Sequence, residues 1–231
     1  MRPSAIGLLF TFFFTACHAQ EIRVSGADGT GELVFSDGAN GSYKSLFYKN
    51  HKGKRFDIFD SGLEFNYIEG SDFYLSPDKT HFFVNFSEIG SIEDGISPAN
   101  ESREYICAFV RMSDGCVVHV DSAGVCGGEW KGSGEWIGAD GFSIGNLDAN
   151  QTTAKKIYFK YLSGFKDASI SSSPKVLKYL PEGTAFDNLL ACDPVSPRSQ
   201  KSYEKLLKLL RRDGDSIDVK KIIKAMGKRR I

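Results

Sequence analysis

The stretch REYICAFVRMSDGCVVHVDS, residues 103–122, decides the fold of this chain. Two runs rich in Val, Ile and aromatic residues flank Asp114-Gly115, a dipeptide that favours a tight turn between antiparallel strands. With these two as the turn residues, counting outward pairs Val110 with His119. We therefore predict a β-hairpin here and expect the rest of the body to be built in the same way.

Similar runs, separated by clusters of Gly, Asp, Asn and Ser, recur every 8–12 residues or so from Glu21 to about Phe165. This spacing is typical of antiparallel β structure. The predicted strands are Glu32–Phe35, Tyr43–Lys49, Arg55–Phe59, Leu63–Ile68, His81–Phe86, Glu104–Arg111, Cys116–Val120 and Lys156–Leu162.

The composition changes after Phe165, where four of the seven prolines lie within residues 174–197. Two apolar stripes at helical spacing follow, the first ending at Gly214 and the second at Gly227. We predict an α+β protein with an antiparallel β-rich body and a C-terminal amphipathic helical hairpin. The predicted parts are a β-rich domain (20–165), an irregular linker (166–197) and a basic helical hairpin (198–231).

The first residues form a signal-peptide layout, with Arg2 before an apolar run that ends at Ala16. Cleavage after Ala19 would remove residues 1–19. The segment Phe14-Thr15-Ala16-Cys17 instead resembles the lipobox of bacterial lipoproteins, which implies removal of residues 1–16 and lipidation of Cys17. Both alternatives predict export, to give a periplasmic, membrane-tethered or secreted protein.

Either cleavage leaves four cysteines, and an even number in an exported chain favours two disulfides. The hairpin register places Cys107 opposite Ser122, so Cys107 and Cys116 are not cross-strand partners. The predicted pairs are therefore Cys107 with Cys126, and Cys116 with Cys192.

The formal net charge is zero, with 29 basic and 29 acidic residues, which argues against attraction of the whole chain to nucleic acid. The charge is nevertheless uneven. Residues 198–231 contain twelve Lys and Arg against four Asp and Glu, whereas residues 20–197 contain sixteen against twenty-five. The basic segment is either a solvated face, a surface that docks on the acidic β part, or a contact for an anionic surface or acidic partner, with Lys220, Lys221 and Lys224 as candidate contacts.

Catalytic signals are sparse. The sequence contains no P-loop and no HExxH, and the cysteine spacing fits no compact zinc pattern. We expect no cofactor and no metal. His119 and Asp121 lie two residues apart on one strand, where the carboxylate could orient the imidazole. A structural histidine remains the simpler interpretation.

The most distinctive phrase is GGEWKGSGEWIG, which holds both tryptophans of the chain. In one interpretation Trp130 and Trp136 only cover the edge of the core. In a second, the phrase is an exposed recognition loop that also uses Glu129 and Glu135. In a third, the two carboxylates are the acid and base of a glycan hydrolase.

These observations predict an exported, non-enzymatic module that binds another protein. An inhibitor, or an immunity protein that neutralises a secreted toxin or enzyme, fits this class. The alternative is a secreted hydrolase acting on glycans through Glu129 and Glu135, so the question of enzymatic activity stays open at this point.

Overall fold

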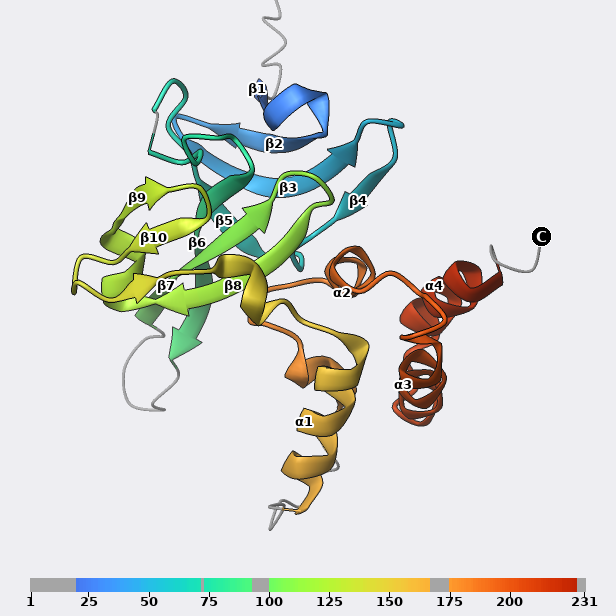
Figure 1. Cartoon of the computed structure of the whole chain (residues 1–231). Helices are drawn as coiled ribbons and strands as arrows, with labels where there is room; N and C mark the ends of the chain where they lie inside the picture. The colour runs from blue at the N-terminus through green and yellow to red at the C-terminus, as the bar shows by residue number, and fades with distance from the viewer. Residues whose placement is uncertain (1–19, 72, 93–99, 167–174, 228–231) are drawn as a thin grey trace, which may run out of the picture.

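The computed structural model describes residues 20–71, 73–92, 100–166 and 175–227. The body is an antiparallel sheet with the strand order β1-β2-β3-β5-β6-β7-β8, and β4 pairs with β3 outside this path. Figure 1 shows this body with the helices gathered on one side of it. The strands are β1 (Gln20–Ser25), β2 (Gly31–Ala39), β3 (Ser42–Asn50), β4 (Arg55–Asp57), β5 (Leu63–Asn66), β6 (His81–Ile92), β7 (Asn100–Arg111) and β8 (Cys116–Ser122).

The sheet is strongly curved around an aromatic core. Phe35 of β2 and Phe82 of β6 lie with ring centroids 6.0 Å apart, although β3 and β5 separate these two strands in the sheet. Tyr67 stacks on Phe35 at 4.8 Å and fills the same space. Alternation along the strands therefore directs one set of large side chains into the concave side of the sheet.

A second, three-stranded sheet covers part of the opposite face. It consists of β9 (Glu129–Gly132), β10 (Glu135–Ile137) and β11 (Ser143–Ile144). Trp136 of β10 is fully buried and stacks on Phe83 of β6 at 4.6 Å. Short 3-10 helices occupy several connections: η1 (Ala27–Gly29), η2 (Ala123–Gly127), η3 (Leu147–Asn150) and η4 (Val176–Tyr179).

The hairpin of β7 and β8 is confirmed, but its predicted register is wrong. Phe109, not Val110, pairs with His119, and a bulge follows Phe109. Arg111 pairs with Cys116, so four residues rather than two connect the strands. The reason is Asp114, whose carboxylate accepts hydrogen bonds from the Arg111 side chain and from the Cys116 backbone N–H at 3.0 Å.

The predicted strand Lys156–Leu162 is also wrong, because this segment lies in helix α1 (Ala154–Lys166). Ala154, Ile157 and Tyr161 are the buried residues, a spacing that belongs to one face of a helix. The backbone N–H of Ala154 donates to the Asp193 carboxylate at 2.9 Å, which satisfies one of the free groups at the start of the helix.

The predicted C-terminal helical hairpin is confirmed, and with it the α+β fold. The remaining helices are α2 (Phe186–Cys192), α3 (Gln200–Arg212) and α4 (Ser216–Gly227). Asp215 accepts a hydrogen bond from the Asp218 N–H at 3.0 Å and so caps α4. Together with α1 and η4 the helices enclose a second core, which contains Ile157, Leu189, Tyr203, Leu206, Leu210 and Ile222.

Both predicted disulfides are confirmed, Cys107 with Cys126 and Cys116 with Cys192. The second bridge joins β8 to α2. Beside it, the Asn188 side chain accepts a hydrogen bond from the Val117 backbone N–H at 2.7 Å. These contacts cover β8, which would otherwise be an open edge of the sheet.

The segment predicted as an irregular linker, 166–197, contains η4 and α2 among its described residues. The domain boundaries stay a prediction. The predicted leader, with both cleavage sites and Cys17, lies outside the described residues. Within the described ranges, no helix has the length and apolar character needed to cross a membrane.

Candidate functional site

An aromatic cavity of about 750 Å³ opens where the segment between β5 and β6 meets β1 and β9. This volume lies in the range of ligand pockets, about 300–1,000 Å³. Val24, Tyr67, Gly70, Ser71, Phe73, Tyr74, Leu75, Ser76, Pro77, Lys79, Phe82, Glu129 and Trp130 line it. We call it the Trp130 cavity.

Trp130 is half-buried and firmly held. Its indole N–H donates to the backbone carbonyl of Phe73 at 3.0 Å. Its ring packs edge-on against Trp136 at 5.1 Å and against Phe109 at 5.8 Å. Phe73 keeps 38% of its surface exposed and also packs edge-on against Trp136. Trp130 and Phe73 thus form a fixed aromatic wall that solvent still reaches.

Two opposite charges complete the lining of the cavity. Glu129 is exposed at the start of β9, and Lys79 is exposed on the turn before β6. Lys79 has a positive φ of 58°, which is uncommon for a residue with a side chain. The backbone N–H of Ala27 donates to the Lys79 carbonyl at 3.1 Å, so this conformation is held by a contact with η1.

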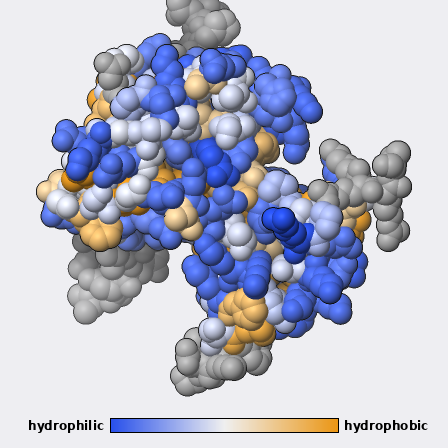
Figure 2. Space-filling view, in the orientation of Figure 1, coloured by the Kyte–Doolittle hydropathy of each residue, from blue (hydrophilic) through white to orange (hydrophobic). Residues whose placement is uncertain are grey.

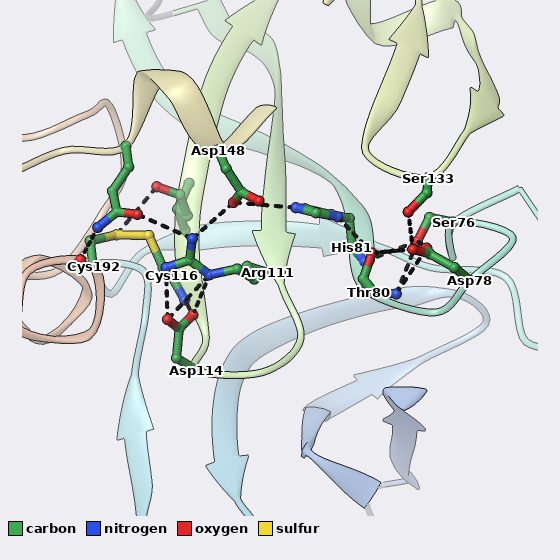
Figure 3. Close-up of polar contacts among 12 residues, drawn as sticks. Ser76, Asp78, Thr80, His81, Arg111, Asp114, Cys116, Ser133, Asp148 and Cys192 are labelled. Carbon is green, nitrogen blue, oxygen red and sulfur yellow. Dashed lines mark hydrogen bonds and ion pairs between the residues drawn. A yellow bond between two sulfur atoms is a disulfide. The ribbon is translucent and has the colours of Figure 1, made fainter. Parts of the chain in front are cut away.

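Asp78 organises the turn that carries Lys79. Its carboxylate accepts hydrogen bonds from Ser76 Oγ at 2.7 Å, from Thr80 Oγ1 at 2.8 Å and from Ser133 Oγ (Figure 3). Partial burial alone would raise the pKa of Asp78, but the hydrogen bonds from Ser133, Ser76 and Thr80 outweigh it and lower this pKa to about 2. The turn is therefore anchored to the small sheet through an ionised carboxylate.

A second, polar cavity of about 570 Å³ lies on the other side of this turn, and Lys79 lines both cavities. His81 is its most enclosed polar side chain, with 5% of its surface exposed. One ring nitrogen lies 2.9 Å from Thr80 Oγ1, and the other lies 3.5 Å from Asp148 Oδ1. Asp148 in turn accepts a hydrogen bond from Arg111 at 2.8 Å, as Figure 3 shows.

This polar cluster resembles a hydroxyl, imidazole and carboxylate chain, but its contacts are those of a scaffold. The Thr80 hydroxyl lies 2.8 Å from both Asp78 oxygens, which hold it in place rather than leaving it to attack a substrate. Arg111 is shared between Asp114 and Asp148. The cluster therefore ties the β7–β8 hairpin, η3 and the turn before β6 together.

The structure divides the predicted recognition loop. Glu129 and Trp130 line the Trp130 cavity. Trp136 was expected to be exposed in the recognition hypothesis, and this is wrong: its side chain is fully buried and its N–H donates to the Val125 carbonyl at 2.7 Å. Trp136 supports Trp130 from behind and does not reach the surface.

The two predicted carboxylates do not share a cavity lining. Glu135 is not among the residues that line the Trp130 cavity, and its side chain accepts a hydrogen bond from Ser143 Oγ at 3.3 Å. Glu129 pairs across the small sheet with Ile137, and Glu135 pairs with Gly132. Glycan hydrolysis by two carboxylates needs them on opposite sides of one bond, so this arrangement gives that hypothesis no support.

The three candidate lysines also differ from one another. Lys220 and Lys224 are exposed on α4. Lys221 was expected to be available to a partner, but it is half-buried and pairs with Asp187 at 2.8 Å and Asp218 at 2.9 Å. Burial would lower the pKa of Lys221, but the two carboxylates outweigh it and raise this pKa. Lys221 joins α4 to α2.

His119 and Asp121 contact each other as expected, with 3.0 Å between Nε2 and Oδ2. The ring of His119 also packs near Phe109 at 5.9 Å.

Sequence analysis missed Phe73, Lys79, His81 and Asp148, because no motif connects positions so far apart in the chain. In the part of the chain that the structure describes, no group of three or more His, Cys, Asp or Glu residues could hold a metal ion.

Comparison of the chain with protein-family models, with curated proteins and with solved structures found no match. The functional argument therefore depends on the site itself.

Proposed function

We propose that this protein is an exported binding module that holds a protein partner through the Trp130 cavity. The observation that carries the proposal is the fixed aromatic wall of Trp130 and Phe73 beside the oppositely charged Glu129 and Lys79. Tryptophan is the residue most often found at the energetic centre of protein interfaces.

The cavity suits an apolar side chain presented by another protein. Its aromatic lining offers apolar contact, and the two charges can orient polar groups that surround the inserted side chain. The contacts of Trp130 with Phe73 and Trp136 hold the wall in place before binding, which reduces the entropy lost on association. A secreted toxin or enzyme is the kind of partner that we infer.

The two disulfides support the proposed export. Two disulfides form readily in the periplasm or outside the cell and are rare in the cytosol. The signal-like leader points the same way, and the choice between lipidation of Cys17 and release of a soluble protein is part of the proposal. Two observations weigh against the glycan-hydrolase alternative. Glu129 lines the Trp130 cavity whereas Glu135 does not, and the Glu135 carboxylate accepts a hydrogen bond from Ser143.

The first test identifies the partner by site-specific photocrosslinking in the producing cells. A photoreactive residue replaces Glu129, and in a matched control it replaces Lys52, which is exposed in the β3–β4 connection. We expect a discrete protein adduct from position 129 and none from position 52. Equal adducts from both positions, or none from either, would contradict a partner at the cavity.

The second test measures affinity for the partner so identified. Trp130→Ala should weaken binding about thirtyfold, mainly through faster dissociation, because it removes an interfacial anchor. Phe142→Ala is the control, since Phe142 is 61% exposed and does not line the cavity. If the partner is also attracted by charge, Lys220→Glu with Lys224→Glu should slow association, and salt should reduce the difference. Unchanged affinity of the correctly folded Trp130→Ala variant would refute the proposal.

A further inference from the structure

An aromatic and basic patch lies on the helical side of the molecule, outside the Trp130 cavity. It consists of Lys155, Tyr158, Phe159 and Leu162 of α1 together with Lys205 of α3. Figure 2 shows hydrophobic surface over α1 next to hydrophilic side chains. Neither of the two cavities described above includes any of these residues.

Two apolar members of the patch, Phe159 and Leu162, are exposed because α1 buries its other face. Phe159 keeps 52% of its surface exposed and Leu162 keeps 37%, whereas Ile157 and Tyr161 are buried in the helical core. Lys155, Phe159 and Leu162 follow one another at intervals of four and three residues, so they form a single stripe along the helix. This stripe points away from the residues that hold α1 to α3.

Lysine side chains lie beside the exposed ring of Phe159 and the half-buried ring of Tyr158. Lys155 Nζ lies 6.0 Å from the centre of the Phe159 ring, and Lys205 Nζ lies 4.7 Å from that of Tyr158. The two rings are neighbours on α1, with centroids 5.9 Å apart, and Lys205 extends the patch to α3. No Asp or Glu occurs anywhere in the sequence of α1. The patch therefore combines apolar groups with positive charge that no acidic residue of α1 neutralises.

We propose that this patch contacts the surface of a bilayer that contains anionic lipids. Helices that lie in a membrane interface combine exposed aromatic and Leu side chains with flanking lysines. The apolar groups enter the boundary of the acyl chains, and the lysines remain among the anionic headgroups. Exposed Phe159 and Leu162 would supply the apolar contact, and Lys155 and Lys205 the charge.

The geometry favours a lipid surface over an acidic protein. Phe159 and Leu162 lie three residues apart on one face of a single helix, and neither lines a described cavity of this chain. Lysine is a flexible point charge without the fork geometry that specific carboxylate recognition uses. A fluid layer of headgroups requires neither a pocket nor a fixed pairing.

The test is co-sedimentation with vesicles, using the exported form of the chain with Cys17→Ser so that no acyl chain contributes. Mixed phosphatidylglycerol and phosphatidylcholine vesicles are compared with pure phosphatidylcholine vesicles. We expect binding to the anionic vesicles alone, and weaker binding as the ionic strength rises from about 0.1 M to about 1 M, where the Debye length falls from roughly 10 Å to 3 Å.

Variants assign that binding to the patch. Lys155→Gln with Lys205→Gln should reduce partitioning about 25-fold, since each lysine near an anionic surface contributes roughly fivefold. Phe159→Ser with Leu162→Ser should reduce it at least about tenfold, because the apolar contact is lost. The controls are Phe142→Ser, which removes another exposed ring, and Lys52→Gln with Lys54→Gln, which removes two exposed lysines of the β3–β4 connection.

The proposal holds if the patch variants lose binding while the controls keep it and all variants melt at similar temperatures. Binding that is equal for both kinds of vesicle would refute it, as would equal losses in patch and control variants. Absence of binding to anionic vesicles would also overturn it and leave an acidic protein as the ligand to examine. The Trp130 cavity is not involved in any of these measurements.

Discussion

The two cores of this protein are built in opposite ways. The core of the sheet is dominated by aromatic side chains such as Phe35, Phe82 and Trp136, which come together from strands far apart in the sequence. In the helical core each helix provides a few buried side chains, such as Leu206 and Leu210 of α3. Non-local pairing carries a larger loop-closure cost than helix formation does. Both disulfides accordingly begin in the β7–β8 hairpin.

This contrast directs attention to the junction between the two cores, on which the stability of the whole protein depends as much as on either core. At that junction α2 contributes Cys192 to the bridge with Cys116, Asn188 to the backbone of β8, and Asp187 to the ion pair with Lys221. A short helix thus connects the sheet with α4. Breaking this junction should affect the helices and the sheet unequally.

The largest expected effect comes from the two disulfides. Cys116→Ser with Cys192→Ser opens a bridge with a sequence separation of 76, and Cys107→Ser with Cys126→Ser opens one of 19. On the chain-entropy account the losses are about 4.5 and 3 kcal/mol, because the longer loop gains more freedom when unfolded. Denaturant unfolding gives the free energies, and hydrogen exchange should show extra opening of α2 in the first variant alone. Similar exchange in both variants would argue against a special junction.

Next in size are substitutions that compare the two tryptophans. Trp136→Ala should lower the free energy of unfolding by about 4 kcal/mol, since it leaves a cavity in the aromatic core. Trp130→Ala should cost no more than about 2 kcal/mol, because this side chain already meets solvent. Thermal and denaturant melts of both variants provide the comparison. A larger loss for Trp130→Ala than for Trp136→Ala would contradict the division between support and binding surface.

The smallest expected effect is a difference in how the stability of the two regions depends on pH. The folded pKa of Asp78 is about 2, below its ordinary 3.8, so its ionised form stabilises the sheet region above about pH 4 and this contribution is lost as the pH falls toward 2. Burial raises the pKa of Asp193 in the helical region, although its hydrogen bond from Ala154 opposes this. Ionised Asp193 therefore costs stability at neutral pH, and that cost disappears as the pH falls toward 3.8.

Asp78→Asn should accordingly destabilise the protein at neutral pH, whereas Asp193→Asn should stabilise it, each by less than about 1 kcal/mol because both sites are partly open to solvent. Both differences should shrink in acid. Urea unfolding over this pH range measures them. If both substitutions changed the free energy of unfolding in the same direction, the two carboxylates would not differ as described.

Much of the sheet could be predicted because alternation and turn residues are local signals. The hairpin excluded a Cys107–Cys116 bridge, and the pairing predicted from the two that remained is confirmed, even though the predicted register was wrong. The register depends on Asp114, which contacts both Arg111 and the backbone of Cys116. Such a side-chain contact lengthens the connection without leaving a mark in the hydrophobic pattern.

Helix α1 was missed for a different reason. Its residues Ile157, Phe159 and Tyr161 favour strands when taken alone, and they alternate with Tyr158, Lys160 and Leu162 as in a strand. Packing decides instead, because Ile157 and Tyr161 meet α3 and the helical core. The exposed position of Phe159 follows from that packing and could not be inferred before the helix was known.

The candidate site was predicted only in part. Glu129 and Trp130 stood out through the repeated Gly-Glu-Trp phrase. Phe73 and Lys79 belong to a segment with no comparable signal, and only the curvature of the sheet brings them to β9. Trp136 could not be told apart from Trp130 by sequence, since the two lie opposite each other in one small sheet.

The bridge between Cys116 and Cys192 has a consequence for the fate of a molecule that a protease has cut. A protease that cuts the backbone once between these two residues leaves both pieces covalently joined. The hydrogen bond between Asn188 and Val117, which lies beside the bridge, can then keep α2 in place on β8. A nicked molecule would run as two fragments only after reduction, and its sheet, its Trp130 cavity and its helical surface would still travel together as one particle.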